Sequence, residues 1–158
     1  MMTSSDTKLS RRIGLVFTNE NEVIAELRRL HNGHSKVGNW TLEQAAWHLN
    51  VTTRARMTPG APTPDSPEQI AMRPQLDEML ASGKMPEGLS TPPHFTPPAN
   101  VEGDPIEQLI TTLQEFSRYT GRLASHRFFG TLALDEGRKL NRIHCAHHLS
   151  YFVPTESK

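Results

Sequence analysis

The stretch Asp104-Pro105-Ile106-Glu107-Gln108-Leu109-Ile110-Thr111-Thr112-Leu113-Gln114-Glu115-Phe116 contains the clearest helical pattern in this sequence. Asp104 is a typical N-cap residue, Pro105 suits the first helical position, and Glu107 completes a capping box. The apolar residues that follow recur every three or four positions, which is the spacing of one face of an α-helix. The stretch therefore predicts an amphipathic helix whose buried face carries Ile106, Leu109, Ile110, Leu113, Phe116, Thr120 and Leu123.

Three further segments carry helix start and stop signals. Two of them begin with a polar N-cap residue that has a glutamate or glutamine three positions later. No convincing alternation of polar and apolar residues follows residue 18, so we expect an all-α protein with almost no strand. The boundaries are marked by Asn19 and Gly33 for the first helix, Thr41 and Pro59 for the second, and Leu134 and Phe152 for the fourth.

A long proline-rich connector separates the second and third predicted helices. Eleven of the 12 prolines fall between Pro59 and Pro105, so most of this segment is expected to be extended or turning. Ser66-Pro67-Glu68-Gln69 predicts one short helix near residues 66–80, and the rest of residues 59–103 is expected to pack as ordered coil. A connector of this length allows the third helix to run parallel to the second, whereas a short loop would make them antiparallel.

The composition is that of a single domain, residues 1–158, without excess charge. The chain has 17 Lys and Arg against 17 Asp and Glu, and a nucleic-acid partner would require clustered Lys and Arg. No apolar run approaches the roughly 18 residues that span a bilayer, and the first residues lack the apolar segment of a secretory signal. The single Cys145 excludes an intrachain disulfide and fits a reducing compartment. We therefore expect a cytoplasmic protein with no nucleic-acid or membrane partner.

Histidines are concentrated near the C-terminus. Arg142-Ile143-His144-Cys145-Ala146-His147-His148-Leu149 places three imidazoles within five residues, and His48 lies almost a hundred residues earlier. On a helix the three lie within about a third of the circumference. Either His144 with His148 or His144 with His147 could form a pair of ligands, with His48 from the second helix as the third. Three histidine ligands leave coordination positions open, as in catalytic rather than structural zinc sites.

Simpler interpretations apply to each histidine taken alone. A single buried histidine is more often a hydrogen-bonded core residue, whereas several buried imidazoles are costly without partners. Gln44, one turn before His48, is predicted to orient that imidazole through its amide, and Cys145 is predicted to point away from the cluster as a small core residue. The other histidines are not expected to be ligands: His31 and His34 flank a helix end, His94 lies in a proline-rich loop, and His126 is at most at the mouth of a site.

Four motifs are shared with a known family. They are Gly38-Asn39-Trp40-Thr41-Leu42-Glu43-Gln44 before His48-Leu49, Gly83-Lys84-Met85-Pro86-Glu87-Gly88, Phe128-Phe129-Gly130-Thr131-Leu132, and His144-Cys145-Ala146-His147-His148-Leu149. In this combination the chain resembles, from about residue 12 to residue 152, the DinB/YfiT-like superfamily of metal-binding bundles. It resembles more closely a branch known only as a domain of unknown function.

This resemblance implies an up-down-down-up four-helix bundle with a long crossover between helices two and three. It implies that His48, His144 and His148 bind one divalent ion, such as nickel, zinc or iron, with His147 as a neighbour. Similar bundles include transferases and isomerases that use a low-molecular-weight thiol. We therefore expect a metal-dependent enzyme with a small-molecule substrate, most specifically a thiol-dependent transferase, and a homodimer as the candidate assembly.

Two other functions are compatible with the same residues, namely a metal-dependent hydrolase and a non-enzymatic metal-binding or stress-response module. Two positions also depart from the branch. Arg127 follows His126 where the branch often has proline, which is expected to change a loop beside the site. Gly137 replaces an aromatic residue near the start of the fourth helix, which is expected to widen the pocket.

Overall fold

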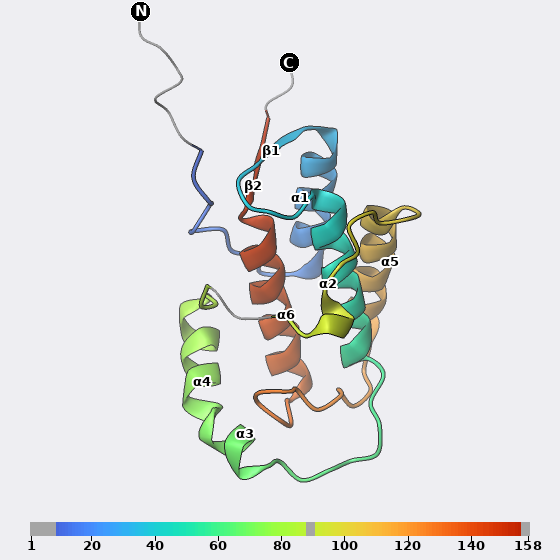
Figure 1. Ribbon diagram of the computed structural model, residues 1–158. Coiled ribbons are helices and arrows are strands. Elements are labelled where there is room, and N and C mark those ends of the chain that lie inside the picture. The colour runs from blue at the N-terminus through green and yellow to red at the C-terminus, as the bar shows by residue number, and fades with distance from the viewer. Residues whose placement is uncertain (1–8, 88–90, 156–158) are drawn as a thin grey trace, which may run out of the picture.

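The computed structural model describes residues 9–87 and 91–155, and the fold of these residues is predominantly helical (Figure 1). They form six α-helices, one short 3-10 helix and one sheet of two strands. The elements are α1 (Glu20–Asn32), β1 (His34–Lys36), α2 (Leu42–Arg56), α3 (Pro67–Ala71), α4 (Arg73–Ser82), η2 (Pro93–Phe95), α5 (Pro105–Arg118), α6 (Leu134–Leu149) and β2 (Phe152–Pro154).

Side-chain caps begin α1, α2 and α5 at the residues that the sequence predicted. The carboxamide of Asn19 and the carboxylate of Asp104 each accept the backbone N–H three residues later. Thr41 and Gln44 form a reciprocal capping box at the start of α2. These bonds satisfy N–H groups that have no partner within the helix. α6 lacks such a cap, because Ala133 at its N-cap position has no side-chain acceptor.

The described part of the proline-rich connector contains two α-helices and the short 3-10 helix η2, where one short helix was predicted. α3 begins at the predicted capping box, and α4 begins afresh at Arg73 because Pro74 is tolerated in the first turn of a helix but not in its interior. Leu76 and Met79 of α4 are buried, whereas Ile70 of α3 is 62 % exposed. Residues 88–90 of the predicted coil lie outside the described residues.

The small antiparallel sheet was not predicted. Ser35 of β1 lies opposite Val153 of β2, and each strand has only three residues, which is too few to show an alternating pattern. The fourth predicted helix was expected to reach Phe152, but α6 ends at Leu149 and the chain then extends into β2.

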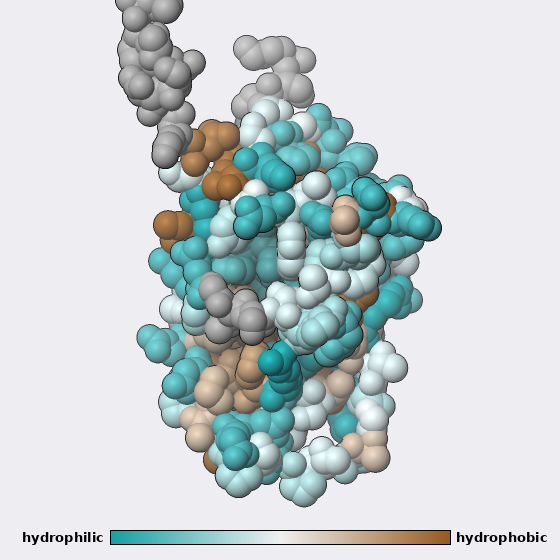
Figure 2. All heavy atoms as spheres, viewed as in Figure 1, coloured by the Kyte–Doolittle hydropathy of each residue, from teal (hydrophilic) through white to brown (hydrophobic). Residues whose placement is uncertain are grey.

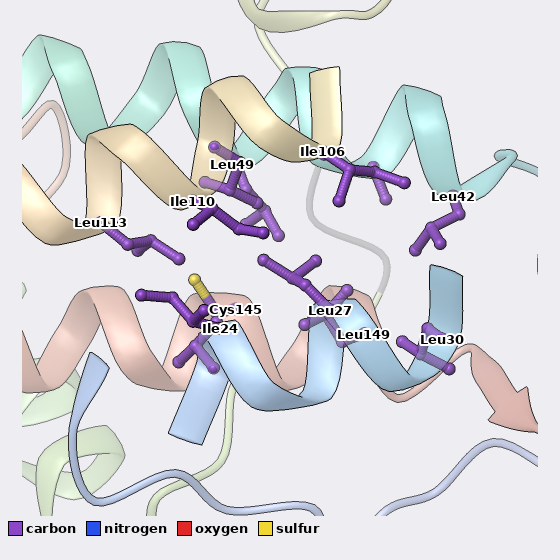
Figure 3. Packing of buried hydrophobic residues seen from close by; sticks show 14 of the residues in the cluster. Ile24, Leu27, Leu30, Leu42, Leu49, Ile106, Ile110, Leu113, Cys145 and Leu149 are labelled. Carbon is purple, nitrogen blue, oxygen red and sulfur yellow. The ribbon is translucent and has the colours of Figure 1, made fainter. Parts of the chain in front are cut away.

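The main core lies between α1, α2, α5 and α6. Figure 3 shows Leu27 of α1, Leu49 of α2, Ile110 of α5 and Cys145 of α6 among the side chains that meet there. Cys145 is fully buried, as predicted for a core residue, and burial raises its pKa to about 12. A thiol in this state is unreactive at neutral pH.

A second, smaller apolar cluster joins α4 to α5, α6 and the loop before α6. Phe116 lies in it and is fully buried. Leu123 and Thr120 were predicted to continue the stripe of α5, but this helix ends at Arg118. Leu123 nevertheless remains buried in the second cluster, where it contacts the start of α6 from the loop.

Side-chain contacts between α2 and α5 show the relative direction of these two helices. Asn50 accepts a hydrogen bond from Thr112, and one turn further along both helices Arg54 pairs with Glu115 at 2.7 Å. Residue numbers therefore rise together along α2 and α5. In Figure 1 the connector passes from the end of α2 through α3 and α4 before it returns to the start of α5.

The face drawn in Figure 2 is mostly hydrophilic or neutral, with a few separate hydrophobic patches. None of the described helices is long and apolar enough to cross a membrane. The large apolar side chains with the greatest exposure among the described residues are Leu9, Ile13, Val16, Ile70 and Phe128.

Candidate metal centre

Three imidazoles converge between α2 and α6. His48 projects from α2 toward His144 and His148, which lie one turn apart on the same face of α6. The Nε2 atom of His144 is 3.1 Å from Nε2 of His48 and 3.1 Å from Nε2 of His148. One nitrogen of each residue lies within 4.8 Å of those of the other two. Two nitrogens that are each about 2.0–2.1 Å from one zinc ion lie about 3 Å apart, so the observed spacing fits a shared ion.

A backbone carbonyl fixes the tautomer of His48. Its Nδ1–H donates to the carbonyl oxygen of Phe95 at 2.8 Å, and because that oxygen can only accept, the proton must lie on Nδ1. Nε2 is therefore left with a free lone pair directed at the other two imidazoles. Gln44 was predicted to supply this contact, and that prediction is wrong, because its amide donates instead to the carbonyl of Pro98 at 3.0 Å.

Burial keeps the three imidazoles neutral. His48 is only 4 % exposed, and burial lowers its pKa, partly opposed by the hydrogen bond to Phe95. Burial also lowers the pKa of His144 and His148 well below the usual value, and the neighbouring imidazoles lower both further. Neutral imidazole is the form that binds metals. A shared cation would satisfy all three inward-facing nitrogens, whereas one N–H cannot donate well to two acceptors.

Trp40 packs against the cluster and holds two of its rings. Its indole is stacked on the His148 ring, with centroids 5.3 Å apart, and its centroid is 5.1 Å from that of His48. Trp40 lies in the loop immediately before α2, next to Thr41 at the N-cap of that helix.

His147 lies beside the cluster but does not join it. Its Nδ1 accepts a hydrogen bond from Nη2 of Arg11 at 2.8 Å, and Arg11 also pairs with Glu87 at 3.1 Å. Burial and the Arg11 charge lower the pKa of His147 to about 4. Of the two pairs that the sequence left open, the structure therefore brings His148, and not His147, to His144 and His48.

The remaining histidines fulfil separate roles. His34 donates from Nδ1 to the carbonyl of Leu30 at 2.8 Å, which matches its expected place at the end of α1. His31 and His94 are exposed. His126 lines the cavity described next, where Nδ1 accepts the N–H of Phe128 at 3.0 Å and its proton is therefore on Nε2.

A cavity of about 190 Å³ opens beside the three histidines. His48, Thr52 and Arg56 recur every four residues along α2 and form one wall. Gly137, Asn141, His144 and His148 form the facing wall on α6. The hydroxyl of Thr53 donates to the carboxamide oxygen of Asn141 at 3.1 Å, so residue numbers fall along α6 as they rise along α2. The apolar part of the lining includes Met79, Met85, Phe95, Phe129 and Leu140.

Gly137 does not widen this cavity in the way that the sequence suggested. A methyl group added at Gly137 would overlap the side chain of Leu123, so the space that a larger residue would occupy is already filled. Arg127, the other departure from the branch, is exposed and places its guanidinium 4.7 Å from the centroid of the Phe128 ring.

A comparison with known protein families identifies the family of this chain. Residues 9–155 match the model of a family described as Protein of unknown function (DUF1569). The chain belongs to the DUF1569 family. No curated protein and no solved structure matches it. The expected membership of a domain of unknown function is thus confirmed over a range that includes both the connector and the three histidines.

Sequence reasoning missed four residues at the centre of this DUF1569 protein, namely Trp40, Arg56, Phe95 and Asn141. Trp40 was quoted in a motif without a role, although an aromatic residue just before a ligand-bearing helix is a usable signal. Arg56 lies eight positions after His48 and Asn141 three before His144, so both share a helix face with a histidine. Phe95 acts through its backbone carbonyl, for which no side-chain signal exists.

Proposed function

We propose that this protein is a metal-dependent enzyme whose divalent ion is held by Nε2 of His48, His144 and His148. The convergence of these three neutral imidazoles beside a cavity carries the proposal. Imidazole suits nickel, zinc and iron, so the donor set fits any of the three. When bound, such an ion lowers the pKa of a coordinated thiol or water.

The reaction that we propose is transfer of a low-molecular-weight thiol to a small electrophilic substrate. The described lining of the cavity contains no aspartate or glutamate that could serve as a general base. A thiol needs no such base once its pKa is lowered, whereas hydrolysis commonly uses one to activate or position water. A reducing cytoplasm would supply the thiol and would suit the unpaired Cys145.

The residues around the three histidines have defined tasks in this proposal. The Phe95 carbonyl keeps the His48 proton on Nδ1, so that Nε2 remains available. Trp40 restricts rotation of the His148 ring by stacking on it. The methionine and phenylalanine side chains of the cavity exclude water from the reacting groups and hold the apolar part of the substrate.

We also propose that α1, α2, α5 and α6 form the up-down-down-up bundle of the DinB/YfiT-like superfamily. Parallel α2 and α5 and antiparallel α2 and α6 support this arrangement. The sheet contributes further support, because it joins the segments that follow α1 and α6 and so places the ends of these two helices together. A crystal structure with the ion bound would test the topology and the ligands together.

Metal analysis tests the centre directly. Wild-type protein purified without chelator and offered nickel, zinc or iron should retain about one ion per chain. His48→Ala and His148→Ala should each weaken binding by more than roughly 100-fold, because loss of an outer partner of a ligand alone costs about 10- to 100-fold. His147→Ala is the matched control and should retain the ion.

Two results would contradict the proposal. Wild-type protein that retains none of the three metals would leave a polar-lined helical domain as the better account. Loss of metal from His147→Ala but not from His148→Ala would show that the ligand pair on α6 is wrong. If the metal is retained, turnover of electrophilic substrates that depends on an added thiol distinguishes a transferase from a hydrolase or a non-enzymatic module.

A further inference from the structure

The Arg56 guanidinium faces the cavity without a counter-ion. It is a lining residue at the C-terminal end of α2, two turns from His48, and its Nη1 atom is buried with no hydrogen-bond partner. Among the described residues no carboxylate pairs with it. Burial lowers the pKa of Arg56 from its usual value, because removing the guanidinium from water disfavours its charged form. An unpaired buried cation is costly and therefore uncommon.

Two further residues with N–H donors line the same cavity. The carboxamide of Asn141 accepts from Thr53, but its Nδ2 is buried and unpartnered. The neutral imidazole of His126 carries its proton on Nε2, because Nδ1 accepts from the backbone of the following loop. The carbonyl oxygen of Arg56 accepts the backbone N–H of Ala124 at 2.9 Å, two residues before His126, so the chain near His126 packs against the end of α2. Burial, with smaller contributions from the charges of Arg56 and Arg127, lowers the pKa of His126 to about 3.

The rest of the cavity lining is apolar and indicates what kind of group a ligand would carry besides a hydrogen-bond acceptor. The apolar side chains of Met79, Met85, Phe95, Phe129 and Leu140 line the same cavity as the donors and the three histidines. The cavity of about 190 Å³ exceeds the roughly 150 Å³ of an engineered apolar cavity that binds benzene. The space is therefore large enough for an aromatic ring or a chain of similar size.

We infer that this end of the cavity binds the carboxylate of an organic anion, whose apolar body lies against the methionine and phenylalanine side chains. The guanidinium of Arg56 supplies the charge, and the N–H groups of Asn141 and His126 supply additional donors. A carboxylate satisfies all three, because its two oxygens together offer about four acceptor sites. The inference deepens the proposed function by naming the substrate class, and it depends on that function only in treating this anion as the substrate.

Binding of two matched probes to metal-free protein tests the inference. Benzoate and its neutral analogue benzamide would be titrated by calorimetry in the presence of EDTA, so that neither can bind a metal ion. Wild-type protein should bind benzoate at least tenfold more tightly than benzamide, and Arg56→Gln should lose most of that preference. Arg28→Gln removes one positive charge outside the cavity lining, from a pair with Glu107 on the surface, and should keep the preference.

A stability measurement separates this role from a structural one. Arg56→Met removes a half-buried charge that has no counter-ion among the described residues, so its melting temperature without ligand should equal or exceed that of wild-type protein. Benzoate should raise the melting temperature of wild-type protein but not that of the variant. A large fall for Arg56→Met, equal binding of benzoate and benzamide, or no binding of either would overturn the inference. Because EDTA is present throughout, failure of the metal proposal would leave these expected results unchanged.

Discussion

α5 and α6 are helices of similar length that pack in the same core, yet they bury different kinds of residue. α5 has 14 residues, and its buried face is apolar except for Thr112. α6 has 16 residues and buries Asn141 beside its apolar positions, while His144 and His148 extend from it into the three-histidine cluster. Packing explains every buried residue of α5 but only part of α6. The positions of α6 that packing does not explain are those that line the cavity, as expected where function competes with stability.

The largest effect should come from truncation on α5. Leu109 is fully buried in the main core and does not line the cavity, so Leu109→Ala should lower the free energy of unfolding by about 2–5 kcal/mol. Metal stoichiometry of the folded variant should not change. Urea unfolding would measure the stability, and metal analysis would measure the stoichiometry. Thr111 is exposed, so the control Thr111→Ala should change the free energy of unfolding by less than about 0.5 kcal/mol. Loss of metal from folded Leu109→Ala would show that α5 also supports the metal centre and does not serve core packing alone.

Acidification should act through the histidines of the cavity and not through α5. The pKa is about 3 for folded His126 and about 4 for folded His147, whereas an unfolded histidine titrates near 6.5. Between these values the unfolded chain binds more protons, so stability is lost as the pH falls below about 6.5. His126 should cost about 1–2 kcal/mol between pH 7 and pH 5 in metal-free protein, and the half-buried His147 should cost less because solvent screens it. His126→Gln should show a shallower loss in urea unfolding, and an unchanged profile would contradict the assignment.

Gly137 offers a test of how closely the start of α6 is packed. Gly137→Ala should lower the free energy of unfolding by about 1–2 kcal/mol, because the clash of the added methyl group with Leu123 outweighs the roughly 1 kcal/mol that alanine gains over glycine in a helix. At Gly60 the same substitution meets no atom within 4 Å, so Gly60→Ala should change stability little. Thermal denaturation of the pair would measure the difference. If the two variants melt alike, Leu123 can move aside and the start of α6 is loosely packed.

The smallest effects should appear at the N-termini of the two helices. Asp104→Ala removes the side-chain cap of α5 and should cost about 1 kcal/mol. Ala133→Asp should stabilise α6 by a similar amount, since Ala133 is exposed, has an extended backbone and offers no cap of its own. Opposite signs in chemical denaturation are the expected result. A loss of stability in Ala133→Asp would mean that the loop before α6 cannot admit the carboxylate.

Much of the fold could be predicted because its signals are local. Asn19, Thr41 and Asp104 each form their cap within a single turn, and the stripe of α5 extends over about three turns. The strands β1 and β2 could not be predicted, because three residues carry no period and their pairing joins segments more than a hundred residues apart. One helix was predicted near residues 66–80, whereas Pro74 lies in the first turn of a second helix, α4.

The candidate site was predicted only to the extent that its residues are close in sequence or share a motif. The one-turn spacing of His144 and His148 is visible in the chain itself, and the resemblance connected this pair with His48. The contact of Phe95 was missed because a carbonyl oxygen is common to every residue. Gln44 was assigned the wrong partner, because helix periodicity shows which side chains share a face but not what lies opposite them.

His48, Thr52 and Arg56 lie on one rigid helix, so the distance between His48 and Arg56 along the cavity is fixed. Eight residues at about 1.5 Å each separate the backbone positions of His48 and Arg56 by about 12 Å, and a hydrogen-bonded helix cannot stretch to change that interval. The length of a molecule that contacts both His48 and Arg56 must therefore equal this backbone separation minus the distance that the two side chains cover. Selection by length would then be set by the pitch of one helix, and inserting a single residue between His48 and Arg56 would alter both the interval and the direction in which Arg56 points.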